Sequence, residues 1–206
     1  MMETESLSLL FALAIGFTHA FEVDHLVAVS SMATKRDSIW QAMKDGIFWG
    51  LGHTSTIFLI GMIMIVGKWM ISNDTFSVLE GAVGLMLVIL GILRIKDIRK
   101  SKSPLGHSHT HSNKIAYGVG LVHGLAGSGT IVLFVLLHMK SISNGLMYLL
   151  TFGLGSILGM LVASGVLSVP FSKKLTSNQK VKLGLSYLSA VLCIVIGGQI
   201  ISENFL

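Results

Sequence analysis

Long apolar runs, separated by short polar connections, dominate the pattern of this 206-residue chain. Six runs reach the roughly 20 residues that a helix needs to cross a hydrocarbon core about 30 Å thick. Their apolar positions are continuous and do not alternate with polar ones, which favours helices over the strands of a membrane barrel. The predicted spans cover residues 7–32, 46–67, 76–95, 115–139, 145–169 and 181–201.

The composition agrees with this pattern. The chain is 52% hydrophobic and 12% charged, and its mean hydropathy is +0.76. The acidic start, residues 1–6, lacks the basic stretch and cleavage site of a secretory signal, so we expect the first run to stay in the mature protein. The sequence predicts an all-α integral membrane protein with six transmembrane helices, whose residues 1–206 form one transmembrane domain in the lipid bilayer.

The basic residues predict the orientation. Three lie in the first connection, six in the third and four in the fifth, which is thirteen of the fifteen Lys and Arg residues. The positive-inside rule places these connections in the cytoplasm, and therefore both termini outside a multi-pass protein of the cell membrane. The basic residues behind the formal net charge of +5 are thus explained by membrane topology. No nucleic-acid partner is expected.

A weak internal repeat relates the two halves of the chain, about 7–95 and 115–201. The hexapeptide IGFTHA at 15–20 aligns with VGLVHG at 119–124, and GLG at 50–52 falls near GLG at 153–155. Because each half has three spans, the second half must be inverted relative to the first, as in many secondary transporters. The alternative is chance similarity between glycine-rich membrane helices.

The first span contains an unusual cluster, HAFEVDH at 19–25. Ionisable groups inside a membrane cost several kcal/mol each when unpaired, so a cation that they bind would offset this cost. On a regular helix His19, Glu22 and His25 share one face while Asp24 points away, so a joint site requires a bend or break. Imidazole and carboxylate ligands suit nickel, cobalt, zinc or iron. The alternative is a packed polar cluster held by internal hydrogen bonds.

Further histidines extend this candidate metal site. His53, early in the second span, can approach the cluster from an antiparallel neighbouring helix. His123 is the repeat partner of His19 and is either a ligand or a structural polar contact. Glu80, near the outer end of the third span, is either an entrance residue or an ordinary interfacial carboxylate.

The central connection, about 96–114, contains alternating histidines. His107, His109 and His111 lie beside Pro104 and Gly106. Such a loop can capture a transition metal as it leaves the membrane, or it can be a solvated linker.

Two other chemistries are disfavoured. Cys193 is the single cysteine, which excludes an internal disulfide and a dithiol electron carrier. No phosphate-cradling glycine loop with its Lys and Ser/Thr is present, so the chain does not hydrolyse nucleotides by that motif.

The quoted residues resemble a known family. HAFEVDHLVAVSSMATKR, followed by GIFWGLGHTSTIF, is similar to the nickel/cobalt permeases, whose signature is His, four residues and Asp-His in one helix, then Gly-His-Ser/Thr in the next. HGLAGSG and the His-rich loop resemble the six-span UreH-type branch, nickel permeases found with urease genes. The resemblance implies uptake of Ni²⁺, or of Co²⁺, for metalloenzyme assembly, with ligand roles for His19, Asp24, His25 and His53. Glu22 replaces the more usual Asp, and the chain lacks the helix that precedes the signature in eight-span permeases.

The sequence therefore predicts a secondary permease for a divalent transition metal, nickel first and cobalt second, with no prosthetic group and no enzyme activity. A cytoplasmic metallochaperone is a further candidate partner. We expect the ion to be partly dehydrated at the imidazole-carboxylate site and released by rocking of the two halves. The alternatives are an exporter of a metal or small anion, and an intramembrane hydrolase that uses Ser128 with a histidine or a metal site.

Overall fold

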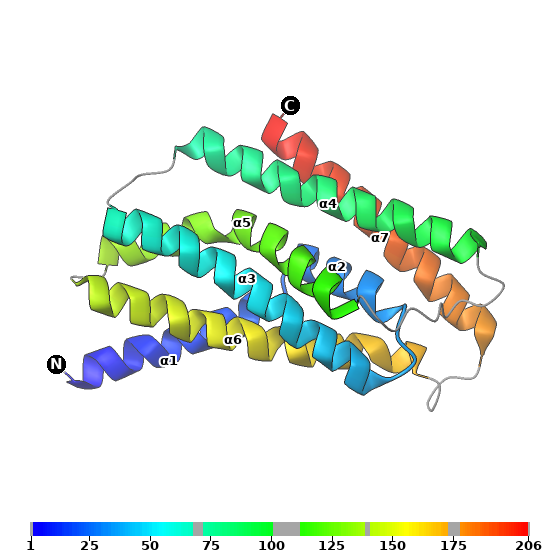
Figure 1. The fold of residues 1–206 in the computed structure, drawn as a ribbon, viewed down its shortest axis with the longest axis horizontal. Helices are drawn as coiled ribbons and strands as arrows, with labels where there is room; N and C mark the ends of the chain where they lie inside the picture. The colour runs from blue at the N-terminus through cyan, green and yellow to red at the C-terminus, as the bar shows by residue number, and fades with distance from the viewer. Residues whose placement is uncertain (1, 68–71, 101–111, 139–140, 173–177, 206) are drawn as a thin grey trace.

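In the computed structural model, the described part of the chain forms seven α-helices that lie side by side along one direction (Figure 1). The structure describes residues 2–67, 72–100, 112–138, 141–172 and 178–205, and of residues 2–7, 73, 112 and 127–138 it describes the backbone alone. These described residues form no β-strand. The elements are α1 (Met2–His19), α2 (Val23–Ala33), α3 (Ile39–Gly67), α4 (Asn73–Lys100), α5 (Ser112–His138), α6 (Ile142–Ser168), the 3₁₀ turn η1 (Val169–Phe171) and α7 (Gln179–Phe205).

The all-α membrane prediction is confirmed. Among the described residues, α3, α4, α6 and α7 are long and apolar enough to cross a bilayer, and the bent pair α1–α2 makes a fifth crossing if it counts as one span. The fourth predicted span, 115–139, falls on α5, a helix of 27 residues that covers it as far as residue 138. The count of six spans stays a prediction.

The two ends of the bundle differ in what they contain. The start of α1 lies at the far left of Figure 1, and α7 runs from the right toward the top centre. We call the end of the bundle toward which the start of α1 and the end of α7 point the terminal end. At the other end, the basic end, α2 leads into α3, α4 finishes, and α7 begins. All six Lys and Arg residues of the α2–α3 connection and of the last two turns of α4 lie there: Lys35, Arg36, Arg94, Lys96, Arg99 and Lys100.

A break separates α1 from α2 and bends the first span by 56°. The α1 helix ends in tight turns, with Phe21 N bonding Thr18 O at 2.9 Å and Glu22 N bonding His19 O at 3.0 Å. Glu22 then takes an extended conformation, with φ −63° and ψ 152°, as the N-cap of α2. The predicted interruption of the first span is therefore confirmed, and it lies inside the HAFEVDH cluster.

Glycines allow the helices to pack closely. α3 lies between α5 and α6, α1 packs along α6, and α4 packs along α7. A Cβ added to Gly120 would overlap the carbonyl oxygen of Trp49, and one added to Gly16 would overlap that of Phe152. Small residues at such contacts let helix backbones approach, which is how helices associate where lipid weakens the hydrophobic effect.

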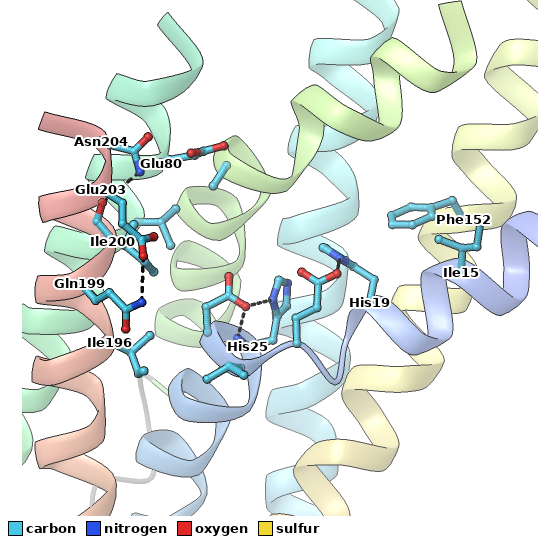
Figure 2. A pocket seen from close by; sticks show the side chains of 15 residues that line it. Ile15, His19, His25, Glu80, Phe152, Ile196, Gln199, Ile200, Glu203 and Asn204 are labelled. Carbon is cyan, nitrogen blue, oxygen red and sulfur yellow. Dashed lines mark hydrogen bonds and ion pairs between the residues drawn. The ribbon is translucent and has the colours of Figure 1, made fainter. Parts of the chain in front are cut away.

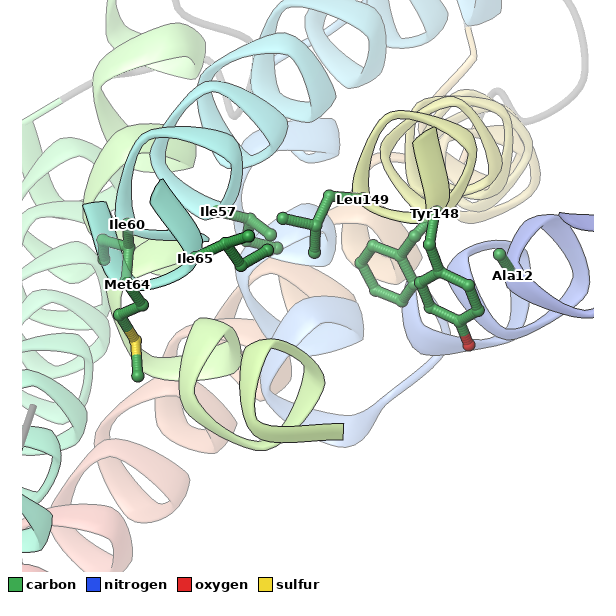
Figure 3. Packing of buried hydrophobic residues seen from close by; sticks show 8 residues of the cluster. Ala12, Ile57, Ile60, Met64, Ile65, Tyr148 and Leu149 are labelled. Carbon is green, nitrogen blue, oxygen red and sulfur yellow. The ribbon is translucent and has the colours of Figure 1, made fainter. Parts of the chain in front are cut away.

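Two apolar clusters fill the interior at different levels. The first, shown in Figure 3, joins α1, α3 and α6 through Ala12, Ile57, Ile60, Met64, Ile65, Tyr148, Leu149 and Phe152. The second lies toward the basic end and joins α2, α3, α4, α5 and α6 through Ala20, Ala28, Val29, Trp49, Leu87, Ala116, Val119 and Met160. His53 lies between the α3 members of these clusters, and it is fully buried.

Polar contacts tie the basic end together. The guanidinium of Arg36 donates to both oxygens of Asp45, at 2.5 Å from Nε and 2.8 Å from Nη2. Arg94 of α4 donates to Thr34 O at 2.9 Å and to Ser186 Oγ at 3.1 Å. These contacts link the end of α2 to α3, α4 and α7.

The predicted second span, 46–67, lies inside a longer helix. Lys44 and Asp45 interrupt the apolar pattern, so it predicts a start at residue 46, whereas α3 begins at Ile39. The pair with Arg36 explains the difference, because it lets Asp45 be buried within a helix. His53 consequently lies at the middle of α3 and not near its start, and α3 packs chiefly against α5 and α6.

Candidate metal centre

Four imidazole rings from four helices meet at the break in the first span. His19 ends α1, His25 lies in the first turn of α2, His53 is at the centre of α3, and His123 lies in α5. The His25 ring centroid is 4.5 Å from that of His19, 5.1 Å from that of His53 and 4.1 Å from that of His123. All four residues are buried, with exposed fractions between 0% and 7%.

In two of these histidines, the Nδ1 atom contacts a carboxylate. Oε1 of Glu22 lies 2.8 Å from Nδ1 of His19, and Oδ1 of Asp24 lies 2.9 Å from Nδ1 of His25. A carboxylate at Nδ1 fixes the ring orientation and leaves Nε2 as the free ligand atom, which is the usual arrangement behind metal-binding histidines.

Several other ring nitrogens of the centre have no hydrogen-bond partner. Nε2 of His19, Nε2 of His25 and both ring nitrogens of His53 are buried and make no hydrogen bond. One ligand atom from each of the three rings lies within 4.8 Å of the others. Two nitrogens on opposite sides of an ion, each about 2.1 Å away, would be about 4.2 Å apart. A small inward movement would therefore let the three rings hold one transition-metal ion.

Asp24 connects a second group of ligand atoms. Its Oδ2 lies 2.9 Å from Nε2 of His123, while Oδ1 also accepts from the backbone N–H of His25 at 2.8 Å. Ligand atoms of Asp24, His25 and His123 also lie within 4.8 Å of one another. The sequence gives His123 no carboxylate neighbour; the fold supplies one from α2. Only the break in the helix lets Asp24 and His25 both reach the centre.

Glu22 stands apart from the other predicted ligands. Its side chain is 58% exposed, whereas that of Asp24 is 24% exposed. Glu22 therefore lies at the rim of the centre, where it contacts His19. His107, His109 and His111 lie outside the described residues, and so does the side chain of Ser128.

Trp49 is a buried neighbour that the sequence pattern did not single out. Its ring centroid lies 5.5 Å from that of His25 and 5.6 Å from that of His123, and its Nε1 has no partner. A tryptophan in an apolar helix looks like ordinary packing, and only the aligned position of Phe152 in the second half hints at a special place.

A cavity of about 840 Å³ leads from the centre toward the terminal end of the bundle (Figure 2). His19 and His25 lie at its deep side, and Glu80, Gln199 and Glu203 line its far side on α4 and α7. Ile15, Phe152, Ile196 and Ile200 form much of its apolar wall. Two histidines of the centre, His19 and His25, therefore line a cavity large enough for a hydrated cation.

Comparisons with known proteins identify the group to which the chain is related. Residues 10–199 match a family model described as the cytochrome C biogenesis protein transmembrane region. The urease accessory protein UreH of Bacillus sp. strain TB-90 is 34% identical over 91% of this chain and 87% of its own length. A protein of Methanocaldococcus jannaschii that is named as a nickel/cobalt efflux system is 31% identical over 95% of the chain and 92% of its own length.

A shorter match points the same way. The nickel transporter NixA of Staphylococcus aureus is 29% identical over 42% of the chain and 28% of its own length. No solved structure matches the chain significantly. These three relatives are named as a urease accessory protein, an efflux system and a nickel transporter, and the apolar helices make the chain a multi-pass membrane protein. The chain therefore belongs to the family of the transmembrane-region model and, on its similarity to UreH, to the UreH-type branch of the nickel/cobalt transporter superfamily.

Proposed function

We propose that this protein carries Ni²⁺, and less readily Co²⁺, inward across the cytoplasmic membrane, and that the buried imidazole centre is its transport site. The observation that carries the proposal is the grouping of His19, His25 and His53, each of which places one ligand atom within 4.8 Å of the others. Each of these rings also has a buried nitrogen without a hydrogen-bond partner. Buried polar atoms without partners are costly, so a bound ion is the simplest way to satisfy all three. We infer that the metal is nickel or cobalt from the names of two relatives.

Each member of the predicted ligand set has a role in this proposal. His19, His25 and His53 provide nitrogen ligands, and Asp24 with His123 forms the adjoining group that shares His25. Asp24 supplies negative charge inside the bundle, which lowers the cost of bringing a divalent cation there. Glu22 orients His19 from the rim. His107, His109 and His111 receive the released ion on the cytoplasmic side.

The membrane potential is sufficient to drive uptake. A divalent ion that moves inward across 100 mV, inside negative, gains about 4.6 kcal/mol, which is roughly a thousandfold accumulation or more. In the proposed orientation the terminal end is outside, and the cavity faces it. The contacts of Arg36 and Arg94 close the basic end, so this conformation corresponds to an outward-facing state.

Reciprocal glycine contacts support the inverted repeat of three spans in each half. Gly16 and its aligned residue Gly120 meet the carbonyls of Phe152 and Trp49, which precede the aligned glycines 153 and 50. Gly52 meets Tyr117 and Leu121, and its counterpart Gly155 meets the equivalent residues Leu13 and Phe17. Gly84 and Gly197 each approach the other's carbonyl. A pseudo-twofold relation between the halves accounts for all three pairs, and it permits alternating access by rocking.

Efflux is the second candidate direction. It is favoured by the relative from Methanocaldococcus jannaschii, which is named as an efflux system. The same centre could serve either direction, because a passive carrier follows the electrochemical gradient.

Right-side-out vesicles from a bacterial strain without its own nickel uptake would test the direction. With an inside-negative potassium diffusion potential, we expect radioactive nickel to accumulate and cobalt to compete with it. Removing the potential should abolish accumulation beyond equilibrium. The opposite result would be loss of nickel from preloaded right-side-out vesicles against the potential, with no accumulation under any condition. That result would identify the protein as an exporter.

The two carboxylates of the cluster should differ in importance. Asp24→Asn is expected to lower apparent nickel affinity about 10- to 100-fold, the usual effect of losing a carboxylate behind a histidine ligand. Glu22→Gln should lower it less than about fivefold, because Glu22 is solvent-exposed and a screened contact is worth less. Initial uptake rates over a range of nickel concentrations measure both. Equal losses in the two variants would contradict the assigned roles.

A further inference from the structure

The far side of the cavity contains acidic residues that the proposed site does not use. Glu80 of α4 is half-buried and Glu203 of α7 is exposed, and both line the cavity that reaches His19 and His25. Figure 2 shows them on the two helices that face the break between α1 and α2. The two carboxylates are therefore separated from the imidazole centre by the cavity itself.

Packing between α4 and α7 holds the two carboxylates at the same level of the bundle. Gly81, the residue after Glu80, has no side chain, and the ring of Phe205 occupies that space. Gln199 donates from Nε2 to Oε1 of Glu203 at 2.8 Å, and Asn204 donates to the carbonyl of Ile200 at 3.0 Å. The acidic side is consequently ordered by neighbouring amides.

The charge of the cavity has one sign. The described residues that line it include four carboxylates, those of Glu22, Asp24, Glu80 and Glu203, and no Lys or Arg. Its wall is otherwise largely apolar, with Val83, Ile196 and Ile200 near the acidic side. A cleft lined by one sign of charge between low-dielectric walls focuses its field and raises the local concentration of oppositely charged ions.

A second observation is that two histidines with unpartnered nitrogens line this cavity. His25 is 1% exposed and His19 is 7% exposed, both line the cavity, and Nε2 of each lacks a hydrogen-bond partner. An acidic mouth without such an interior would be an ordinary solvated surface. In this cavity, the carboxylates attract cations toward histidines whose buried nitrogens lack a partner and can bind a cation.

We propose that Glu80 and Glu203 form an outer capture site, which holds a hydrated divalent cation through its water shell before the ion reaches the imidazoles. The inference rests on the proposed function and adds the residues that set the rate of ion capture. Hard oxygen ligands suit an ion that still keeps its waters, whereas the imidazoles suit the partly dehydrated transition metal. Capture should therefore affect how fast nickel arrives more than how fast a bound ion crosses.

Initial rates of nickel uptake in right-side-out vesicles test the capture site, with the double variant Glu80→Gln/Glu203→Gln at matched expression. The amides keep the size of the side chains and remove two charges. We expect KM for Ni²⁺ to rise about tenfold at low ionic strength, with Vmax within twofold of wild type. High concentrations of choline chloride should shrink the difference, because salt screens the carboxylates of the wild type.

Asp74→Asn is the matched control. Asp74 is an exposed carboxylate in the first turn of the same helix, and it does not line the cavity. Its removal should leave KM unchanged. Two results would overturn the capture site, provided that the double variant keeps the wild-type melting temperature. One is an unchanged KM, and the other is a lower Vmax with an unchanged KM. A wild type that carries no nickel would contradict the proposed function, and the capture site with it.

Discussion

Replacing His25 by alanine is expected to abolish nickel binding and transport, with a loss of apparent affinity of more than about 100-fold. His25 belongs to both groups of ligand atoms, and its ring lies within 5.1 Å of the rings of His19, His53 and His123. Removing a residue that only hydrogen-bonds to a metal ligand typically lowers metal affinity about 10- to 100-fold. Removing a ligand that both groups share should therefore lower the affinity by more. Isothermal titration of purified protein with nickel would measure the effect.

The loop histidines offer the matched control for this substitution. A triple variant, His107→Ala/His109→Ala/His111→Ala, removes three imidazoles from the central connection and leaves the buried centre intact. It should lose weak nickel binding and keep the high-affinity site. If His25→Ala binds nickel as tightly as wild type while remaining folded, the buried centre is not the transport site.

Replacing Gly120 by leucine is expected to prevent assembly of the bundle. Even a Cβ at this position would overlap the carbonyl oxygen of Trp49, so the α3 and α5 backbones would have to separate. Overpacking in a well-packed interior typically costs about 1–3 kcal/mol, and displacement of a helix backbone should reach or exceed the upper value. Separation at this level would also pull His53 away from His123.

Gly118 provides a control on the same helix. A Cβ added there would meet no atom within 4 Å, so Gly118→Leu should assemble normally. Gel filtration of fluorescent fusions in detergent, followed by thermal melting, would compare the two variants. Equal yields and melting temperatures for Gly118→Leu and Gly120→Leu would contradict the close contact between α3 and α5.

Much of the helical architecture could be predicted from the apolar pattern. The helices cover the predicted spans, because a long apolar run has few alternatives to a helix in lipid. The start of α3 ahead of its apolar run has a specific cause: a pattern of apolar residues cannot represent a buried ion pair, and the buried Asp45 pairs with Arg36, which lies outside the helix. Contacts between helices distant in the sequence, such as α1 with α6, also exceed what local pattern can specify.

Some features of the site could likewise be predicted from the sequence, whereas others depend on the tertiary fold. Adjacent ionisable residues inside an apolar run revealed His19, Glu22, Asp24 and His25, and their incompatible directions predicted the break. The exposed position of Glu22 and the contact between Asp24 and His123 depend on the tertiary fold, since 99 residues separate the latter pair. Glu203 was hidden for another reason: a carboxylate near the end of a span is common, and only the cavity relates it to Glu80.

X-ray absorption at the nickel edge would test the central claim most directly. The sample is nickel-loaded protein that carries the loop variant His107→Ala/His109→Ala/His111→Ala, with and without His25→Ala. Imidazole nitrogens at about 2.1 Å, together with their characteristic outer-shell scattering, are predicted for the loop variant. Their number should fall when His25 is also replaced. A spectrum with oxygen ligands alone, or one that His25→Ala leaves unchanged, would contradict the buried imidazole centre as the nickel site.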